Sequence, residues 1–488
     1  MFEIDLPDTA VVTPLVDAEL VDAIIASSKL DSAVQARHLA AVGELWDRRK
    51  RRAQEDEREY FYIDLREAVA AEVAAALGIT GSRAAGLIRV AEALRDRLPK
   101  VSAIFAKGEI DLAMVHAIVN RTELIEDPES LTAVDAALAE RAPGWTKYSR
   151  RSIAEYIDSW IGRFDQAGVR EKRKPTDNRY LDVRGSGEGM AGIWGNLHVN
   201  DAIVFDGRID ELVATVCPND PRTKAQLRAD AVRALSERAD RMVCTCGDAN
   251  CTGEQPGPDR DIVIHVLAES STVDGDDAAP GYVSGFGPIA ADTLRAFAKR
   301  ARRKAFTIPR DAVAEPGYRP SVALAEFVRF RDLHCRFPGC DVPAARCDID
   351  HTIPWPAGPT HPSNTKCLCR KNHLLKTFYV GPGGWRDRQL PDGTVVWTAP
   401  TGQTYTTKPG GPLYFPALGQ PTGVLVLPLA PAESDPQRDR MMPRRQRTRA
   451  EDVAQRHAAE RRRNEARIAA EEHRRGLRET GDCDPPPF

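Results

Sequence analysis

Apolar residues recur at helical spacing through the first third of the chain. Val69, Val73 and Leu77 lie four residues apart, Gly78 is placed to end that helix, and Ser82 is placed to cap the next one. Further short, alanine-rich helices are predicted up to about residue 164. The pattern therefore predicts a mostly helical N-terminal region with tight turns.

From about residue 178 the pattern changes to short apolar runs between glycine-rich turns. It predicts strands at 180–183, 190–199 and 261–266, and helices at 201–216 and 223–242. Together with the helices before it, this strand-containing part is expected to form one domain over residues 16–310.

A polar loop inside this part carries Cys244, Cys246 and Cys251. Three thiols this close together would supply three ligands of a tetrahedral zinc site, with Cys217 or His265 as the fourth. The alternative is a set of reduced, exposed thiols on a loop, and the spacing alone does not choose between the two.

The C-terminal part divides by composition. A β-hairpin extension is predicted over 381–410 around the turn Pro391-Asp392-Gly393, and a proline-rich linker over 411–437. The tail over 438–488 is rich in arginine: from Arg438 to Arg478 it holds 14 Arg against seven Asp and Glu. Because it has little apolar surface to bury, it is expected to be an exposed helix or disordered.

Composition narrows the class of protein. The 488 residues are 42% hydrophobic, which excludes a wholly disordered or fibrous chain, and the formal net charge of −3 excludes a uniformly basic protein. No run of 18 apolar residues predicts a membrane span, and the opening residues lack the order of a secretory signal. We therefore expect a cytoplasmic, multidomain protein whose clustered cysteines bind metal rather than form disulfides.

The segment 330–379 concentrates the residues that can carry chemistry. Cys335 and Cys340 form a C-x4-C knuckle, and Cys369 follows 29 residues later. Thiolates at this spacing suit a closed structural zinc site that staples a small domain. Buried thiols without a ligand are the alternative.

The same segment holds a second set of polar residues, namely Asp350, His351, Asn364 and His373. Oxygen ligands such as those of Asp350 and Asn364 favour a hard divalent ion, and an imidazole such as that of His373 widens the choice of metal. His351 has a side chain that can act as a general base near neutral pH. The ordered combination with the cysteines is far more specific than any one residue.

This segment resembles the HNH (ββα-metal) nuclease family, whose three signature letters fall on His351, Asn364 and His373. The whole chain, over roughly residues 20–410, more closely resembles the 13E12 repeat family of mycobacteria and their relatives. Those proteins join a helical domain of unknown function, number 222, to a C-terminal HNH module. The match is carried by Cys335-Arg-Phe-Pro-Gly-Cys340-Asp, Asp348-Ile-Asp-His-Thr-Ile-Pro-Trp355, His361-Pro-Ser-Asn364, Leu374-Leu-Lys-Thr-Phe378 and Leu390-Pro-Asp-Gly-Thr.

The resemblance implies an α+β fold: a mostly helical N-terminal domain with a small strand-containing part, a ββα-metal HNH module over 320–380, then the hairpin and the charged helical or disordered tail. It also implies a metal-dependent DNA endonuclease. In that mechanism His351 deprotonates the attacking water, while Asp350 and His373 hold a divalent ion: magnesium or manganese, with nickel or zinc as further choices. Asn364 either orients the base or joins the metal shell, and the products carry a 5′ phosphate and a 3′ hydroxyl.

One position departs from the family pattern. The family commonly places a zinc-binding His three residues after the cysteine that aligns with Cys369, and here that position is Asn372, a poor zinc ligand. Either Cys367 or Cys347 substitutes as the fourth ligand, or the zinc staple is weakened.

Local charge favours a nucleic-acid partner. Residues 299–376 hold 15 Lys and Arg against seven Asp and Glu. The expected contacts to the DNA backbone are Lys366, Arg370, Lys371 and Lys376, with ordinary solvated surface charge as the alternative for each. The runner-up to an endonuclease is a catalytically decayed, nucleic-acid-binding relative of a mobile-element nuclease, and a third hypothesis is a zinc-stabilised interaction scaffold.

Overall fold

The computed structural model describes residues 16–53, 57–170, 179–187, 189–248, 251, 265–299, 301–379, 384–423, 425 and 441–479. The chain divides into two compact units. Unit 1 comprises residues 1–171, 309–409 and 419–488, and unit 2 comprises 172–308 and 410–418. The domain expected over 16–310 spans both units: its helical half groups with the segment 330–379, and its strand-containing half lies in unit 2.

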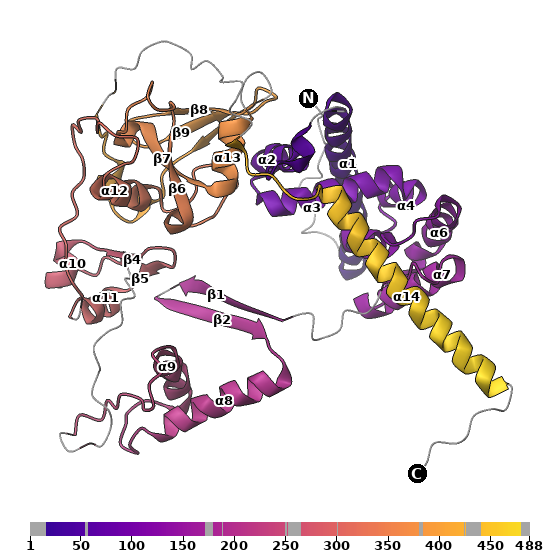
Figure 1. Cartoon of the computed structure of the whole chain (residues 1–488), viewed down its shortest axis with the longest axis horizontal. Helices are drawn as coiled ribbons and strands as arrows, with labels where there is room; N and C mark the ends of the chain where they lie inside the picture. The colour runs from indigo at the N-terminus through magenta and orange to yellow at the C-terminus, as the bar shows by residue number, and fades with distance from the viewer. Residues whose placement is uncertain are drawn as a thin grey trace. The chain divides into compact units, whose positions relative to one another are not determined.

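The N-terminal part of unit 1 is helical, as predicted (Figure 1). Gly78 ends the second helix with φ +63°, a left-handed conformation that costs glycine nothing. The next helix is capped by Thr80 rather than Ser82: the Thr80 hydroxyl accepts from the Arg83 backbone N–H at 3.4 Å. The helices are α1 (Asp17–Arg52), α2 (Leu65–Leu77), α3 (Gly81–Asp96), α4 (Pro99–Ala106), α5 (Leu112–Thr122), α6 (Pro128–Arg141) and α7 (Arg150–Phe164).

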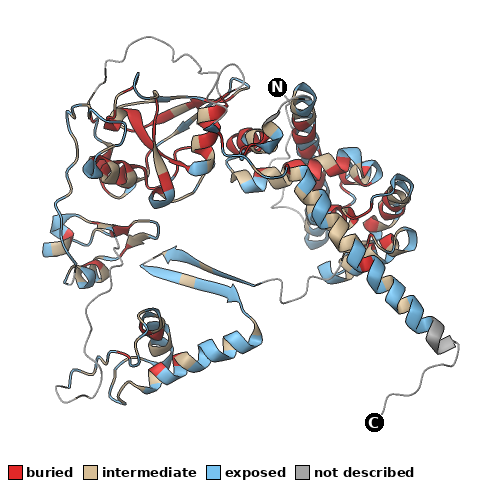
Figure 2. Cartoon of the chain, viewed as in Figure 1, coloured by how far each residue is buried: buried red, intermediate tan, exposed pale blue. Residues whose placement is uncertain are grey.

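The core of this part is assembled from the apolar stripe of each helix. Ile88, Phe105, Val115, Leu138 and Ile157 are fully buried in one continuous cluster. Figure 2 shows these inward faces buried while the opposite faces of the same helices are exposed.

The segment 330–379 folds as helix, two strands and helix within unit 1. Its elements are α12 (Val322–Asp332), β6 (Cys347–His351), β7 (Thr365–Cys369) and α13 (Arg370–Phe378). The strands pair antiparallel, with Cys347 opposite Cys369 and Asp350 opposite Lys366, and α13 starts directly after β7. This register places the cysteines at one end of the strand pair and Asp350 near the other.

The residues after 380 form three strands rather than a hairpin. They are β8 (Arg386–Gln389), β9 (Val395–Thr398) and β10 (Thr404–Thr407), paired antiparallel in the order β10-β9-β8. Trp397 on β9 is fully buried, and its indole N–H donates to the backbone carbonyl of Arg336 at 2.8 Å. The sheet is therefore packed onto the segment 330–379.

The arginine-rich tail is helical over α14 (Arg449–Glu479). Polar contacts hold it to the N-terminal helices of unit 1. The fully buried Asn464 donates to the carbonyls of Ala167 and Val169, both at 2.8 Å, and Arg461 pairs with Asp165 at 2.6 Å. The expectation of a helix is confirmed, but this helix is docked rather than free.

Unit 2 contains the strands predicted at 180–183 and 190–199 and the two predicted helices, with changes at their ends, together with short helices and strands that the pattern did not predict. They are β1 (Tyr180–Gly187), β2 (Met190–Asn196), α8 (Val199–Ala214), α9 (Lys224–Ser236), β3 (Val266–Leu267), α10 (Ser270–Asp274), β4 (Gly281–Val283), β5 (Gly287–Ile289) and α11 (Ala291–Ala298). The strand expected at 261–266 lies mostly outside the described residues. Phe415 and Leu418, at the start of the predicted linker, are buried, so that stretch is packed.

Short 3-10 turns complete the described chain: η2 (Glu57–Tyr60), η3 (Ala142–Trp145), η5 (Ala344–Arg346), η6 (Pro362–Asn364), η7 (Gly411–Leu413) and η8 (Pro416–Gly419). In the described ranges no individual helix has the length and apolar composition to cross a membrane. One pair, α2 with α3, meets those criteria jointly, but its two helices are bent by 107°.

Candidate functional site

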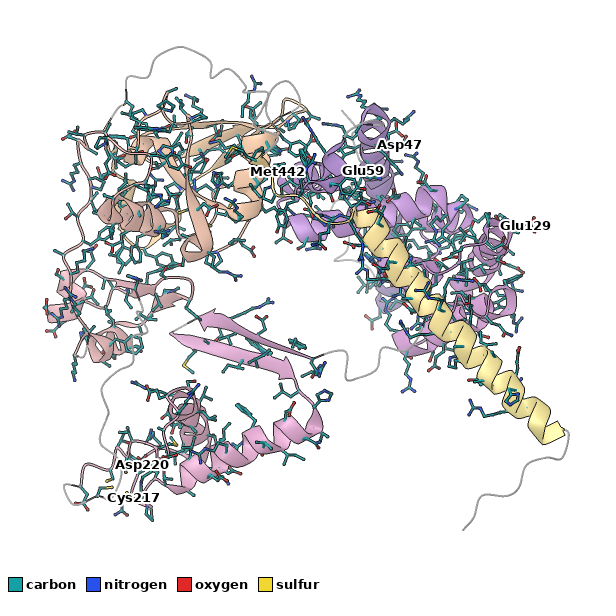
Figure 3. The ribbon with its side chains drawn as sticks, in the orientation of Figure 1. Asp47, Glu59, Glu129, Cys217, Asp220 and Met442 are labelled. Carbon is teal, nitrogen blue, oxygen red and sulfur yellow. The ribbon has the colours of Figure 1, made fainter. Side chains whose placement is uncertain are left out.

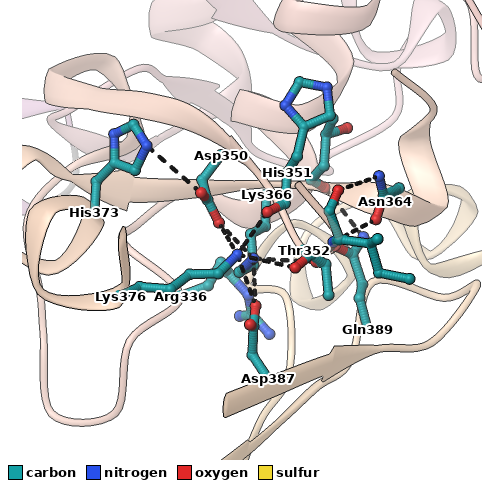
Figure 4. A network of polar contacts seen from close by, with 12 residues as sticks. Arg336, Asp350, His351, Thr352, Asn364, Lys366, His373, Lys376, Asp387 and Gln389 are labelled. Atoms are coloured by element: carbon teal, nitrogen blue, oxygen red, sulfur yellow. Dashed lines mark hydrogen bonds and ion pairs between the residues drawn. The ribbon is translucent and has the colours of Figure 1, made fainter. Parts of the chain in front are cut away.

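His351 lies at the end of β6, beside Asp350 (Figure 4). Its Nε2 lies 2.8 Å from the Thr360 hydroxyl, and that hydroxyl donates its only proton to the Gly317 carbonyl at 2.6 Å. Thr360 therefore has to accept from Nε2–H, which leaves the lone pair of a neutral imidazole on Nδ1. Burial, more than the lysines nearby, lowers the pKa of His351, which favours this neutral form.

Asp350 lies in a buried network of two carboxylates and two amines. Its Oδ2 accepts from Lys366 Nζ at 2.7 Å and from Lys376 Nζ at 2.6 Å, and both amines also pair with Asp387 on β8. Burial acts to raise the pKa of Asp350, but Lys366, Lys376 and His373 outweigh it and hold this pKa well below its usual value. Asp350 is therefore an anion with one oxygen, Oδ1, turned away from the lysines.

His373 of α13 faces that remaining oxygen. Its Nε2 lies 3.5 Å from Asp350 Oδ1, while its Nδ1 lies 2.9 Å from Asp348 Oδ2. A carboxylate can only accept, so Nδ1 carries a proton toward Asp348, and a ring that holds no second proton has its lone pair on Nε2. In that tautomer two electron-pair donors face each other across 3.5 Å, an arrangement that a shared cation stabilises.

Asn364 lies at the start of β7 and holds the loop after His351. Its Oδ1 accepts from the Ile353 N–H at 2.8 Å, and its Nδ2 donates to the carbonyls of Ile353 and Pro359 at 3.1 and 2.9 Å. Both ends of the carboxamide are engaged in these bonds. Of the two roles left open for Asn364, the geometry favours orienting the loop that carries the base over ligating a metal.

Cys335, Cys340 and Cys369 come together as predicted, with their three sulfurs within 4.8 Å of one another. The Asn372 carboxamide donates to the Cys335 sulfur at 3.5 Å, so it occupies the position where a fourth ligand would stand. Burial acts to raise the pKa of Cys335, but hydrogen bonds from the neighbouring thiols and from Asn372 hold it well below its usual value.

The structure distinguishes the two substitutes for a fourth ligand. Cys347 hydrogen-bonds the Cys335 sulfur from the strand position opposite Cys369. Cys367, two residues before Cys369 on β7 and opposite Ile349, donates instead to the Val328 carbonyl at 3.8 Å. Of the two, Cys347 is therefore the one beside Cys335, although its sulfur is not among the three that all lie within 4.8 Å of one another.

Two of the expected DNA-backbone contacts are wrong. Lys366 is 0% exposed and Lys376 is buried beside it, because both amines neutralise Asp350 and Asp387. Lys371 forms an ion pair with Glu67 of α2. Arg370 alone of the four stays largely free, with 63% of its side chain exposed and a long contact of 3.4 Å to Asp348.

Sequence reasoning missed three residues of the site: Asp348, Thr360 and Asp387. Asp348 could have been found, because residues two apart on a strand share a face, and it precedes Asp350 by two. Thr360 and Asp387 give no such signal, since their roles depend on where the loop and β8 fold back.

The described fold and site define a mixed α+β protein with a thiol cluster and a buried carboxylate–imidazole pair, and comparisons with known proteins assign its family. The model for "Domain of unknown function (DUF222)" matches residues 27–332, so the chain belongs to this family. This confirms the helical-domain part of the resemblance.

The chain is similar throughout to mycobacterial proteins. It is 42% identical to "Uncharacterized protein Rv2100" of Mycobacterium tuberculosis (strain ATCC 25618 / H37Rv), over 96% of this chain and 92% of the relative. It is 42% identical to "Uncharacterized protein Rv3776" of the same strain, over 94% and 93%. It is 37% identical to "Uncharacterized protein in est 3'region" of Mycobacterium tuberculosis, over 67% and 100%. No solved structure matches the chain.

Proposed function

We propose that this protein is a metal-dependent endonuclease of the HNH type that hydrolyses phosphodiester bonds in DNA. The observation that carries the proposal is the pair Asp350 Oδ1 and His373 Nε2, which face each other at 3.5 Å beside a histidine with a free Nδ1. The resemblance of the segment 330–379 to HNH nucleases, and of the whole chain to 13E12 repeat proteins, supports the same proposal.

The donor pair fits a divalent ion. Two ligand atoms that each lie about 2.1 Å from one ion are close to 3.5 Å apart when the angle between them is near tetrahedral. One imidazole nitrogen and one carboxylate oxygen suit manganese, nickel or zinc as well as magnesium. Bound there, such an ion would supply charge neutralisation at the phosphate and at the departing oxygen.

The protein's own groups carry the proton transfer. His351 Nδ1 takes the proton from the attacking water, and Nε2–H stays anchored on Thr360, which fixes the ring in the orientation that the transfer needs. Asp348 holds His373 through Nδ1, and Asn364 holds the loop that follows His351. Asp348, Thr360 and Asn364 are thus positioning residues.

Charge supports a polyanionic substrate. The stretch 299–376 has a net excess of eight basic residues, and Arg370 is exposed near His373. Lys366 and Lys376 contribute by neutralising the buried carboxylates rather than by touching phosphate. Binding should therefore weaken steeply as salt concentration rises.

A second candidate, a nucleic-acid-binding relative without catalysis, is favoured by a different observation. His351 is 6% exposed, and the Tyr318 ring stacks on it with centroids 5.4 Å apart. In this arrangement the base is covered, and Tyr318 has to move before a substrate reaches it.

The test is nicking of supercoiled plasmid by the full-length protein with magnesium, manganese or EDTA. We expect metal-dependent nicking, a loss of about 10²–10⁴-fold in His351→Ala and of about 10–100-fold in Asp348→Asn. His116→Gln, which changes a histidine on α5, is the matched control and should keep the wild-type rate.

Either of two results would overturn the nuclease proposal. One is the absence of nicking by folded wild-type protein in every metal. The other is nicking that survives in His351→Ala, which would indicate a contaminating nuclease. Salt-sensitive DNA binding without nicking would support the second candidate.

A further inference from the structure

Unit 2 contains a second cluster of cysteines, separate from the segment 330–379. The sulfurs of Cys217, Cys244, Cys246 and Cys251 all lie within 4.8 Å of one another, and those of Cys217 and Cys244 are 3.3 Å apart. The sequence offered Cys217 or His265 as the fourth member, and the fold selects Cys217. Figure 3 labels Cys217 and the neighbouring Asp220 at the end of α8 and α9 where this cluster lies.

The ends of two helices bring the cluster together. Cys217 follows the end of α8, and Cys244 follows the end of α9. Asp220 joins the two loops: its Oδ2 accepts from the Thr245 N–H at 2.8 Å and from the Cys244 thiol at 3.4 Å. Arg222 pairs with the same carboxylate at 2.9 Å, so Asp220 is itself fixed. The sulfurs are therefore placed by bonds that need no ion.

Backbone amides are aimed at the sulfurs. The Asn219 N–H donates to the sulfur of Cys217, and the Cys246 N–H donates to the sulfur of Cys244, in each case from two residues ahead. An N–H donor stabilises a thiolate more than a thiol, because the sulfur is the acceptor and carries the charge. The Cys246 N–H lowers the pKa of Cys244 to about 7, toward the deprotonated sulfur that binds metal, while the hydrogen bond with Cys244 raises the pKa of Cys217.

The spacing suits a tetrahedral metal thiolate. Zinc–sulfur bonds of about 2.3 Å place the sulfurs of a tetrahedral site about 3.8 Å apart, within the limit that all four sulfurs here satisfy. A disulfide requires about 2.05 Å between two sulfurs and would use them in pairs. A cluster of four thiols at mutual contact matches one shared ion better than two separate pairs.

The apolar core between α8 and α9 is small. The buried apolar cluster formed by α8 and α9 consists of Ile209, Leu212, Ala231, Ala234 and Met242, which is small for two helices. Small folded parts with few buried side chains are commonly held together by a structural metal. A metal at the end of the helix pair would supply that stability.

We propose that Cys217, Cys244, Cys246 and Cys251 form a structural Zn²⁺ site that holds α8 and α9 together. The ion has four protein ligands and no open position, so the site is a staple and not a catalytic centre. The proposal is independent of the nuclease activity, because none of these residues belongs to the segment 330–379.

The first experiment maps the thiols of the wild-type protein. The full chain, purified without oxidation, is alkylated with iodoacetamide before and after a strong zinc chelator, and each cysteine is followed by mass spectrometry. We expect the four cysteines to be protected until chelation and to react together afterwards. Reaction without chelation, or protection that only a reductant removes, would overturn the proposal.

The second experiment measures zinc per chain. Cys217→Ser and Cys246→Ser should each lower the zinc content by one equivalent, and the double variant should lose no more than either single one, because all four thiols hold one ion. Cys367→Ala, which removes a buried thiol outside both clusters, is the matched control and should keep the wild-type content. Unchanged zinc in both single variants, or iron in place of zinc in the wild type, would refute the assignment.

A third readout separates this site from the cluster at Cys335. Hydrogen exchange in the chelated wild type should increase over α8 and α9, and Cys217→Ser should reproduce that increase without affecting β6 and β7. If Cys217→Ser leaves exchange in α8 and α9 unchanged, the staple role is wrong.

Discussion

Lys366 is the cation on which the buried network around Asp350 depends. Its side chain is 0% exposed, and its amine lies 2.7 Å from Asp350, 2.6 Å from Asp387 and 3.0 Å from the Thr352 hydroxyl. Lys366→Met keeps the unbranched stem in contact with the surrounding core and removes only the charge. The variant therefore measures what the amine contributes.

The structure gives the size of the effect. After the substitution, two buried carboxylates share Lys376, which lies 2.6 Å from Asp350 and 3.3 Å from Asp387. Removing one partner of a buried ion pair costs about 3–5 kcal/mol, because the other charge remains desolvated. We expect Lys366→Met to lower the local free energy of unfolding by this amount.

The matched variant removes the unpaired charge as well. In Lys366→Met/Asp387→Asn one carboxylate and one amine, Asp350 and Lys376, remain as a pair. Replacing a whole buried pair is often nearly neutral, so the double variant should lie within about 1–2 kcal/mol of the wild type. Its stability should thus exceed that of Lys366→Met alone.

Native-state hydrogen exchange over β6 and β7, measured along a urea series, is the appropriate assay. It reports the local free energy of opening and does not require the two units to unfold together. A cost below about 1 kcal/mol for Lys366→Met would refute the reasoning. So would a double variant less stable than Lys366→Met, since the unpaired carboxylate would then not be the source of the loss.

Three further predictions concern single positions. Asn372→His should raise zinc occupancy at Cys335 and the melting temperature, measured by metal analysis and thermal unfolding, because an imidazole replaces a carboxamide that is a poor ligand. The Asp135 carboxylate accepts from the Lys100 and Val101 N–H groups at the start of α4, where Leu98 offers no side-chain cap. Asp135→Ala should therefore lower the free energy of unfolding, measured in urea, by about 1–3 kcal/mol. Burial, with a smaller effect of Arg89, lowers the pKa of His116, so the unfolded chain binds a proton at this residue more readily than the folded chain does. The free energy of unfolding should therefore fall as pH drops below about 6.5. His116→Gln should reduce that fall, measured between about pH 7.5 and 5.5.

Each of these has a result that contradicts it. Equal zinc content and melting temperature in Asn372→His and the wild type would remove the argument about position 372. A stability of Asp135→Ala within about 0.5 kcal/mol of the wild type would show that solvent replaces the lost acceptor. An identical loss of stability on acidification in His116→Gln and the wild type would exclude His116 as its source.

The N-terminal helices could be read from the sequence because each one is specified locally. The four-residue spacing of Val69, Val73 and Leu77 and the glycine at 78 act within a few turns of chain. The misplaced cap shows the limit of such reasoning. Thr80 and Ser82 both carry hydroxyls, and only the backbone conformation at Thr80 lets its side chain reach the Arg83 N–H.

The sequence identified the aspartate and histidines of the candidate site, but it did not show how the charges around them are paired. Asp350, His351 and His373 stand out by residue type and order, and the strand pair with the following helix does bring Asp350 and His373 together. The lysines at 366 and 376 look the same in sequence as any surface lysine. Both lysines pair with Asp387 of β8, and a buried carboxylate is stable only beside a counter-charge, so their burial depends on that residue.

The sequence by itself determined which elements form, which cysteines and histidines are available, and the family to which the chain belongs, because these properties reside in local periodicity and motif order. Only the tertiary structure decided which residues meet. In the fold Cys217, and not His265, is the fourth residue of the second thiol cluster. Cys347 lies beside Cys335, and Lys366 is buried. The physical reason is that contacts between distant residues depend on how strands and loops fold back, and a buried charge or thiol is stable only beside the partner that this folding supplies.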